Sequence, residues 1–166
     1  LTKGQASPTS PNGYGESIEE DLDPIMLGLS IPGSTFLARG YSGHPAQLLQ
    51  LTLAALRHTA AGQGLSYLEV LSPCVTYNDT YREWRTGVFN IDSEDGYDPG
   101  NRAGAFERMC ELREQGRLPL GLIYQSERPA LESLALNPEF AAPARQDLND
   151  PGLAAGYREA MQSFIR

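Results

Sequence analysis

The chain has few of the residues that build disulfide frameworks or self-contained metal sites. Its 166 residues include two cysteines, Cys74 and Cys110, and neither has a cysteine or histidine neighbour at ligand spacing. This usage excludes a disulfide scaffold, and it also excludes a metal site made by either cysteine alone. No apolar run approaches the roughly 18 residues needed to span a membrane. The start of the chain lacks the pattern of a secretory leader, so we expect a cytoplasmic protein.

Positive charge is also scarce. The chain has thirteen lysines and arginines against twenty-one aspartates and glutamates in total, which gives a net charge of −8. Such a balance repels nucleic acids and anionic membrane surfaces, so neither is expected as a partner. Four arginines, at 102, 108, 113 and 117, fall on or near one predicted helix. They form either a local basic patch or an ordinary solvated helix face, and the weakness of surface charge pairs favours the second.

Common catalytic signatures are missing. The chain has no glycine-rich nucleotide loop, no nucleophile elbow and no zinc-protease helix. It also lacks the Gly-Asp-Gly…Asn pair that holds a metal and a diphosphate in thiamine enzymes. Spacing alone therefore leaves the function open.

The remaining sequence alternates between helix and strand patterns. Helices are predicted from Asp23-Pro24 to Pro32-Gly33, from Pro45 to about Ala61, over Arg102–Gln115 and over 152–165, with a short one at 80–84. Strands are predicted over 34–39, 65–71 and 118–124. In the second helix Leu49, Leu53 and Leu56 share one line, with Leu48, Leu51 and Ala55 beside it. This order predicts an α/β fold, an αβα sandwich with a mostly parallel sheet.

Two domains are expected from composition. Residues 1–126 carry the α/β pattern, whereas 127–166 are rich in alanine, proline and asparagine and form a carboxyl-terminal extension that could pack on a partner subunit. In parallel sheets ligands bind outside the carboxyl ends of the strands. The loops after Arg39 and after Ser72 are therefore candidate sites.

Cys74 stands just beyond the second predicted strand, separated from it by Ser72 and Pro73. It has three interpretations: a buried structural thiol, a catalytic nucleophile, or one ligand of a cluster completed from outside the chain. The two histidines, His44 in a loop and His58 in a helix, are not spaced to form a dyad with it.

An acidic stretch invites a calcium-loop interpretation that fails on register. The acidic residues are Asp92, Glu94, Asp95 and Asp98, with Gly96 among them. A calcium loop needs glycine sixth and glutamate twelfth, whereas counting from Asn90 makes Gly96 seventh and Asn101 twelfth. We expect a solvated acidic loop.

The first ten residues, Leu1-Thr-Lys-Gly-Gln-Ala-Ser-Pro-Thr-Ser10, combine one cation with small hydrogen-bonding groups. Lys3 is a compact point charge suited to a phosphate or a carboxylate, and Gly4 permits close approach of a ligand. On chemistry alone such a segment is more often a mobile tail.

Four ordered stretches change that interpretation. The first decapeptide, Thr35–Gly43 with its Ala-Arg-Gly, Val70–Asn78 with its Pro-Cys, and the pair Tyr97-Asp-Pro99 and Leu118–Tyr124 resemble segments of 2-oxoacid:ferredoxin oxidoreductase β subunits, the 2-oxoglutarate type above all. The resemblance covers about residues 1–128. Because the decapeptide follows the metal–diphosphate motif in that family, and the chain starts at Leu1, we expect a fragment whose other half is needed for activity.

The resemblance implies part of a thiamine diphosphate-binding domain that pairs with an α subunit. It implies oxidative decarboxylation of a 2-oxo acid to an acyl-coenzyme A, with electrons passing through a 4Fe–4S cluster to ferredoxin. By position, Leu1, Thr2 and Lys3 would line the pocket for thiamine diphosphate, Mg²⁺ and substrate, with Lys3 on a carboxylate or a phosphate. Cys74 would be the last of four cluster ligands.

Alternatives stay open at this point. A related enzyme could act on pyruvate or another 2-oxo acid, and a non-catalytic α/β interaction domain with a buried Cys74 belongs to another class. His44 stands where the family pattern is expected to be acidic, which weakens the substrate assignment rather than the family.

Overall fold

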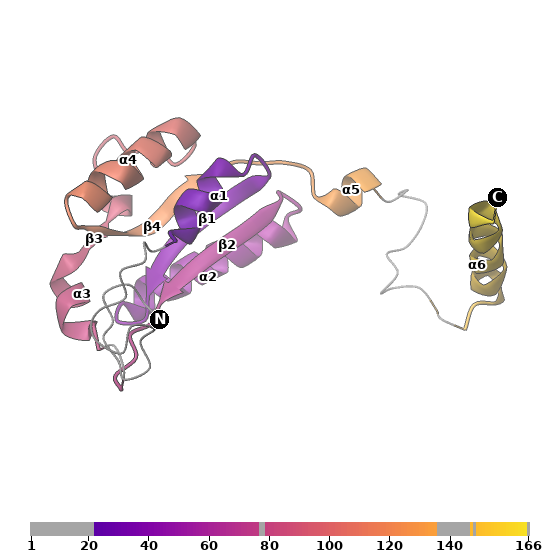
Figure 1. Ribbon diagram of the computed structural model, residues 1–166, viewed down its shortest axis with the longest axis horizontal. Helices are drawn as coiled ribbons and strands as arrows, with labels where there is room; N and C mark the ends of the chain where they lie inside the picture. Colours follow the sequence, from indigo (N-terminus) through magenta and orange to yellow (C-terminus); the bar gives the residue numbers. More distant parts are fainter. Residues whose placement is uncertain (1–21, 77–78, 136–146, 148, 166) are drawn as a thin grey trace, which may run out of the picture. The chain divides into compact units, whose positions relative to one another are not determined.

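The protein is represented by a computed structural model that describes residues 22–76, 79–135, 147 and 149–165 (Figure 1). The chain divides into two compact units, Leu1–Ala130 and Leu131–Arg166. The boundary between residues 126 and 127 that composition indicates stays a prediction.

The first unit contains a four-stranded sheet in the order β2-β1-β4-β3. The strands are β1 (Ser34–Tyr41), β2 (Leu65–Leu71), β3 (Val88–Asn90) and β4 (Leu118–Gln125). Strand β1 runs parallel to β2, and β3 runs parallel to β4, whereas β1 and β4 are antiparallel. The sheet is thus mostly parallel, as predicted, with one antiparallel junction at its centre that the sequence pattern did not indicate.

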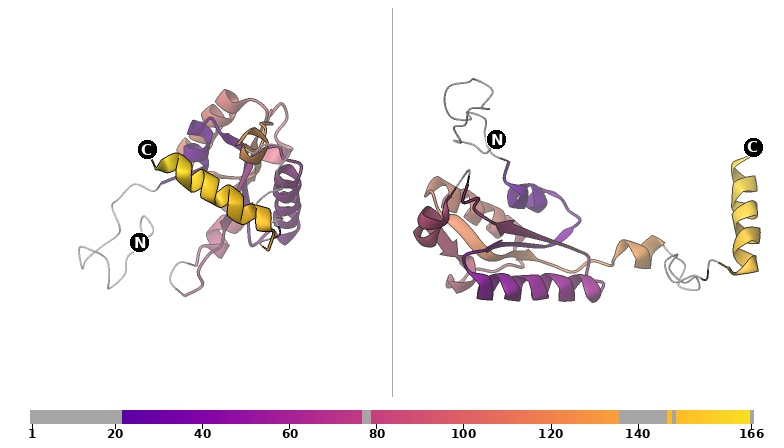
Figure 2. Two further views of the ribbon diagram at one scale, coloured as in Figure 1. Left: turned by 90° about the vertical axis from the view of Figure 1, so that its right-hand side faces the viewer. Right: turned by 90° about the horizontal axis from the view of Figure 1, so that it is seen from below.

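Helices cover both faces of this sheet (Figure 2). Helix α2 (Pro45–Ala60) lies on one face, and α1 (Pro24–Ser30) and α4 (Arg102–Glu114) pack on the other. The predicted αβα sandwich is confirmed. The short helix α3 (Tyr81–Gly87) leads into β3, and a 3-10 turn at Ile91–Ser93 follows that strand. The third strand of the chain, β3, was not predicted because its three residues are too few to show a period.

Alternation along β1 explains why this strand is central. Leu37 packs with α1 and α4 in one core cluster, while Phe36 and Ala38 pack with α2 in the other. All eight residues of β1 are buried, because both of its faces and both of its edges are covered. The buried polar residues of the strand, Ser34, Thr35 and Arg39, therefore need partners inside the protein.

Helix α2 buries a narrower face than its leucines indicate. The buried residues are Leu51, Ala55 and His58, whereas Leu49 and Leu56 are exposed. Of the two leucine lines in the sequence, the one through Leu51 and Ala55 therefore faces the sheet. His58 completes it, with Nε2 3.0 Å from Thr35 Oγ1.

The second unit, Leu131–Arg166, is mainly helical where the structure describes it. It contains α5 (Leu131–Ala135), which was not predicted, and α6 (Pro151–Phe164), which confirms the helix predicted over 152–165. Asp150 caps α6 by accepting a hydrogen bond from the Gly152 amide at 2.8 Å. No helix in the described ranges is long and apolar enough to span a bilayer.

Candidate functional site

The two candidate loops meet at one edge of the sheet. Because β1 and β2 are parallel, with Tyr41 paired to Leu71, their carboxyl ends lie side by side. The Ser42 amide then donates to the Leu71 carbonyl at 2.9 Å, which carries the pairing one residue past both strands. The two loops that the sequence indicates as candidate sites thus lie at one edge of the sheet, and their role in ligand binding stays a prediction.

Cys74 lies at this edge, three residues beyond the end of β2. Pro73 is buried, and Cys74 itself is exposed. This exposure contradicts the interpretation of Cys74 as a buried structural thiol. The second cysteine, Cys110, is half-buried on α4.

The histidines do not make Cys74 a conventional nucleophile. His58 belongs to the last turns of α2, at the opposite edge of the sheet, where it is buried and bonded to Thr35. His44 lies at the same edge as Cys74, but its ring packs edge-on against Tyr41, with centroids 5.3 Å apart. Both imidazoles are thus engaged by other residues, and the role of the exposed thiol stays a prediction.

An aromatic cluster supports the edge. The Tyr41 ring contacts Tyr81 and Trp84 of α3, each with centroids 5.9 Å away. Burial raises the pKa of the Tyr41 phenol, and the neighbouring Tyr81 raises it further. Tyr41 therefore stays neutral, and Tyr81 and Trp84 pack against its ring. The Tyr81 hydroxyl reaches across to Ser42 Oγ, 3.2 Å away.

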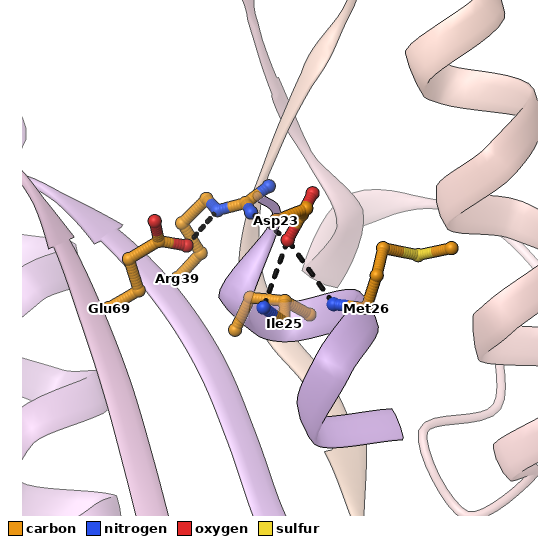
Figure 3. A network of polar contacts seen from close by, with 5 residues as sticks. All are labelled: Asp23, Ile25, Met26, Arg39 and Glu69. Atoms are coloured by element: carbon orange, nitrogen blue, oxygen red, sulfur yellow. Dashed lines mark hydrogen bonds and ion pairs between the residues drawn. The ribbon is translucent and has the colours of Figure 1, made fainter. Parts of the chain in front are cut away.

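Arg39 is the buried charge of the site (Figure 3). Its Nε donates to Glu69 Oε2 at 2.6 Å, and its Nη2 donates to Asp23 Oδ1 at 2.8 Å. The same Asp23 oxygen accepts from the amides of Ile25 and Met26 and so caps α1. One guanidinium therefore joins β1 to β2 and to the start of α1.

A cavity of about 420 Å³ lies beside Arg39. Trp84, Arg113 and Arg117 contribute to its lining, together with Asp23. Its size is within the range of small-molecule pockets. Arg113 and Arg117, two of the four arginines predicted on or near one helix, thus line this cavity. The Arg117 guanidinium also stacks on the Phe89 ring, with Cζ 4.1 Å from the ring centroid.

The other two arginines of that set are held by protein groups. Arg108 pairs with Glu94 and Glu111. Arg102 donates to the carbonyls of Leu29, Ile31 and Ser34. The four arginines therefore form no single basic patch. They do not form a merely solvated helix face either, because Arg102 and Arg108 are bonded to protein groups.

The acidic stretch holds parts of the fold together. Asp92 accepts a hydrogen bond from the Leu122 amide at 2.8 Å, and Glu94 pairs with Arg108. These two carboxylates thus make structural contacts, whereas the sequence predicts a solvated loop. Within the described residues, no group of three or more metal-ligating side chains comes together. Leu1, Thr2 and Lys3, expected to line a cofactor pocket, lie outside the described residues.

Sequence reasoning indicated the two loops and Cys74, but it missed the buried ion pair of Arg39 with Glu69 and the contact of Ser42 with Tyr81. Glu69 lies 30 residues from Arg39, and Tyr81 lies 39 residues from Ser42. The only available signal for the first pair was the parallel register of β1 and β2, which places Arg39 opposite Glu69.

Comparison with known proteins adds independent findings. Residues 74–137 match the family model for the C-terminal part of the pyruvate ferredoxin oxidoreductase beta chain. The 2-oxoacid:ferredoxin oxidoreductase 2, subunit beta, of Aeropyrum pernix is 35% identical over 142 residues, which is 76% of this chain and 44% of the relative. The 2-oxoacid:ferredoxin oxidoreductase subunit beta of Saccharolobus solfataricus is 33% identical over 144 residues, 76% of this chain and 45% of the relative.

A third relative carries a more specific name. The 2-oxoglutarate synthase subunit KorB of Methanothermobacter marburgensis is 30% identical over 140 residues, 79% of this chain and 46% of the relative. The chain thus spans less than half the length of these curated relatives.

Proposed function

The chain belongs to the β-subunit family of 2-oxoacid:ferredoxin oxidoreductases, and from this premise we propose that it takes part in the oxidative decarboxylation of 2-oxoglutarate. The reaction would yield an acyl-coenzyme A and reduced ferredoxin. An α subunit would complete the enzyme. Support comes from the names of the relatives and from the four ordered sequence segments described above.

One observation carries the proposal on this chain: the exposed thiol of Cys74 at the carboxyl end of β2. Thiolates are the usual ligands of iron–sulfur clusters. A thiol that joins ligands from outside the described residues has to be exposed, and Cys74 meets this condition. The described residues offer no complete donor set, so Cys74 fits the part of a single ligand.

The chemistry would be divided between the cofactors and the chain. Bound thiamine diphosphate with Mg²⁺ would supply the electron sink for decarboxylation, and a 4Fe–4S cluster would carry single electrons. Cys74 would hold the cluster by its Sγ. Lys3 would contribute a positive charge to a substrate carboxylate or a cofactor phosphate, with Leu1 and Thr2 beside it.

Replacement of Cys74 tests the cluster role. In the complete enzyme purified without oxygen, Cys74→Ser should lose most of the bound iron and its 4Fe–4S electron paramagnetic resonance (EPR) signal. The matched control is Cys110→Ser on α4, which should keep both. Full iron content in the Cys74 variant would overturn the assignment.

Substrate choice needs a separate experiment. Rates with a panel of 2-oxo acids, ferredoxin and coenzyme A should be highest with 2-oxoglutarate, whereas preference for pyruvate would correct the assignment within the same family. Lys3→Gln should raise KM for 2-oxoglutarate if Lys3 contacts the substrate. It should instead weaken thiamine diphosphate binding if Lys3 contacts the cofactor.

A further inference from the structure

The cavity beside Arg39 brings together positive charge from separate elements of the first unit. Arg39 lies on β1, whereas Arg117 lies in the turn between α4 and β4, and both line this space of about 420 Å³. The chain as a whole has a net charge of −8, so a cavity wall with several arginines is a local exception. Guanidinium groups that line one space from different elements are suited to hold an anion.

Arg39 has one terminal nitrogen that its two carboxylate partners leave unused. Nε donates to Glu69 and Nη2 donates to Asp23, but among the residues that the structure describes no acceptor lies within hydrogen-bond distance of Nη1. In Figure 3 this nitrogen carries no dashed line. The side chain is only 3% exposed, yet Nη1 is not sealed from solvent. The unused N–H groups therefore open into the cavity that Arg39 lines.

Arg117 is held without a carboxylate. Within the described part of the chain its side chain makes no hydrogen bond or ion pair, and its guanidinium stacks on the Phe89 ring. Stacking occupies the face of a guanidinium and leaves the N–H groups at its edge available for oxygen atoms. Arg113, on the same wall, already has a partner in the chain, so it adds charge to the wall but is not counted as a donor.

The acidic residues of the wall do not cancel this charge. Asp23 and Glu83 are the two carboxylates among the lining residues, against three arginines, so the wall keeps an excess of positive charge. Asp23 directs one oxygen to Arg39 and to two amides of α1. Glu83 is exposed on α3.

The rest of the cavity suits an organic group. Its volume is several times that of a single phosphate ion and falls within the range of small-molecule pockets. The apolar part of the wall is made by Trp84, Met109, Leu118 and Pro119. A ligand that fills this space therefore combines an anionic group with an apolar or aromatic body.

We propose that this cavity binds a small phosphate ester, with the phosphate on Arg39 Nη1 and Arg117 and the organic part against Trp84. A phosphate has three terminal oxygens, so it can accept hydrogen bonds from guanidiniums on two elements, whereas a carboxylate is satisfied by one planar fork. Binding would also give the buried Nη1 group of Arg39 the acceptor that it lacks among the described residues. The inference goes beyond the proposed function and does not depend on the role of Cys74.

The test is isothermal titration calorimetry on the complete enzyme at low salt. Thiamine diphosphate and coenzyme A are present in excess, so that any sites for these two compounds are occupied. The probes are phenyl phosphate, inorganic phosphate and benzoate. Phenyl phosphate should bind more tightly than inorganic phosphate, because its ring reaches the apolar wall, and more tightly than benzoate. Its affinity should fall as sodium chloride is added.

Variants assign the binding to this cavity. Arg117→Gln should raise the Kd for phenyl phosphate by about tenfold or more, because a charged hydrogen bond is lost, and Arg117→Lys should recover part of the affinity. Trp84→Leu should weaken binding of phenyl phosphate while leaving that of inorganic phosphate unchanged. The matched control is Arg57→Gln, which removes an exposed arginine of α2 outside the cavity and should keep the wild-type Kd.

Three results would overturn the proposal. These are no heat of binding with phenyl phosphate, equal Kd values for Arg117→Gln and Arg57→Gln, and tighter binding of benzoate than of phenyl phosphate. Arg39→Lys keeps the charge but removes Nη1, so it should also weaken binding. If that variant fails to fold because its ion pairs are buried, Arg117→Gln decides the question.

Discussion

The guanidinium of Arg102 lies over the ring of Tyr124, with Cζ 4.3 Å from the ring centroid. The same group donates to the carbonyls of Leu29 and Ile31, at 2.9 and 2.8 Å, and to that of Ser34 at 2.6 Å. It thereby satisfies carbonyls at the end of α1 and at the start of β1, where a positive charge also complements the helix dipole.

Arg102→Ala should lower the free energy of unfolding by about 2–4 kcal/mol, because several charge-assisted hydrogen bonds are lost together. Arg102→Lys should recover only part of this, since one ammonium cannot reproduce the planar fork. Urea denaturation followed by circular dichroism measures both. The control is Arg128→Ala, whose exposed side chain bonds to the Pro32 carbonyl of the same loop at 3.1 Å. An equal loss in the control would contradict the special role of Arg102.

Asp23 combines a helix cap with an ion pair to buried Arg39. Asp23→Ala should cost about 2–4 kcal/mol, because it removes the cap and leaves Arg39 with Glu69 as its remaining carboxylate partner. Asp23→Asn keeps an acceptor for the helix amides and should cost about 1 kcal/mol. Asn101→Ala, which removes only the cap of α4, is the comparison. If Asp23→Ala costs no more than this control, the ion pair contributes nothing to stability.

Gly121 has a φ of +119°, and a Cβ there would lie 2.6 Å from the Asp92 carboxylate. That carboxylate is held by the Leu122 amide, so it cannot move without loss of the bond. Gly121→Ala should therefore destabilise the protein by about 2–5 kcal/mol. Gly62→Ala, at φ +71° with nothing near the added carbon, should cost only about 1 kcal/mol. Equal thermal unfolding midpoints for the two variants would refute this account.

Tyr97 gives a pH dependence of known sign. Burial, followed by Glu94, Asp92 and Asp98, raises its pKa from 10.0 to about 12, and its hydroxyl donates to the Ile123 carbonyl. Above pH 10 the unfolded chain loses this proton before the folded chain does, so the contribution present below pH 10 is lost between about pH 10 and 12. Tyr97→Phe should be less stable at about pH 8 and should decline less steeply across that window. The control is Tyr157→Phe, exposed on α6; an unchanged slope in Tyr97→Phe would contradict the assignment.

Local signals predicted most of the elements. Asp23-Pro24 marks the start of α1 because an aspartate cap and a proline in the first turn both suit a helix beginning, and the structure shows this cap. The run from Ser34 to Arg39 is buried as expected, and the strand continues to Tyr41. Such features depend on neighbouring residues, so a single sequence contains them.

Other features depend on contacts between distant segments. The antiparallel pairing of β1 with β4 is set by where α4 returns the chain, and periodicity within either strand carries no information about direction. Arg39 was quoted only as part of a resembling segment, and nothing in the sequence near it indicates the two carboxylates that neutralise it. The exposure of Cys74 likewise could not be predicted, since a short segment beyond a strand can be buried or exposed with the same local sequence.

The antiparallel junction has a consequence for how this region can vary in evolution. Because β3 and β4 run opposite to β1 and β2, the chain leaves β2 after Leu71 and begins β3 at Val88 at the same end of the sheet. The connection has to span the width of the sheet, but it does not have to return along the length of the strands, as the α2 crossover from β1 to β2 does. Insertions and deletions among relatives should therefore gather between Thr76 and Tyr81, whereas the α2 crossover should keep its length.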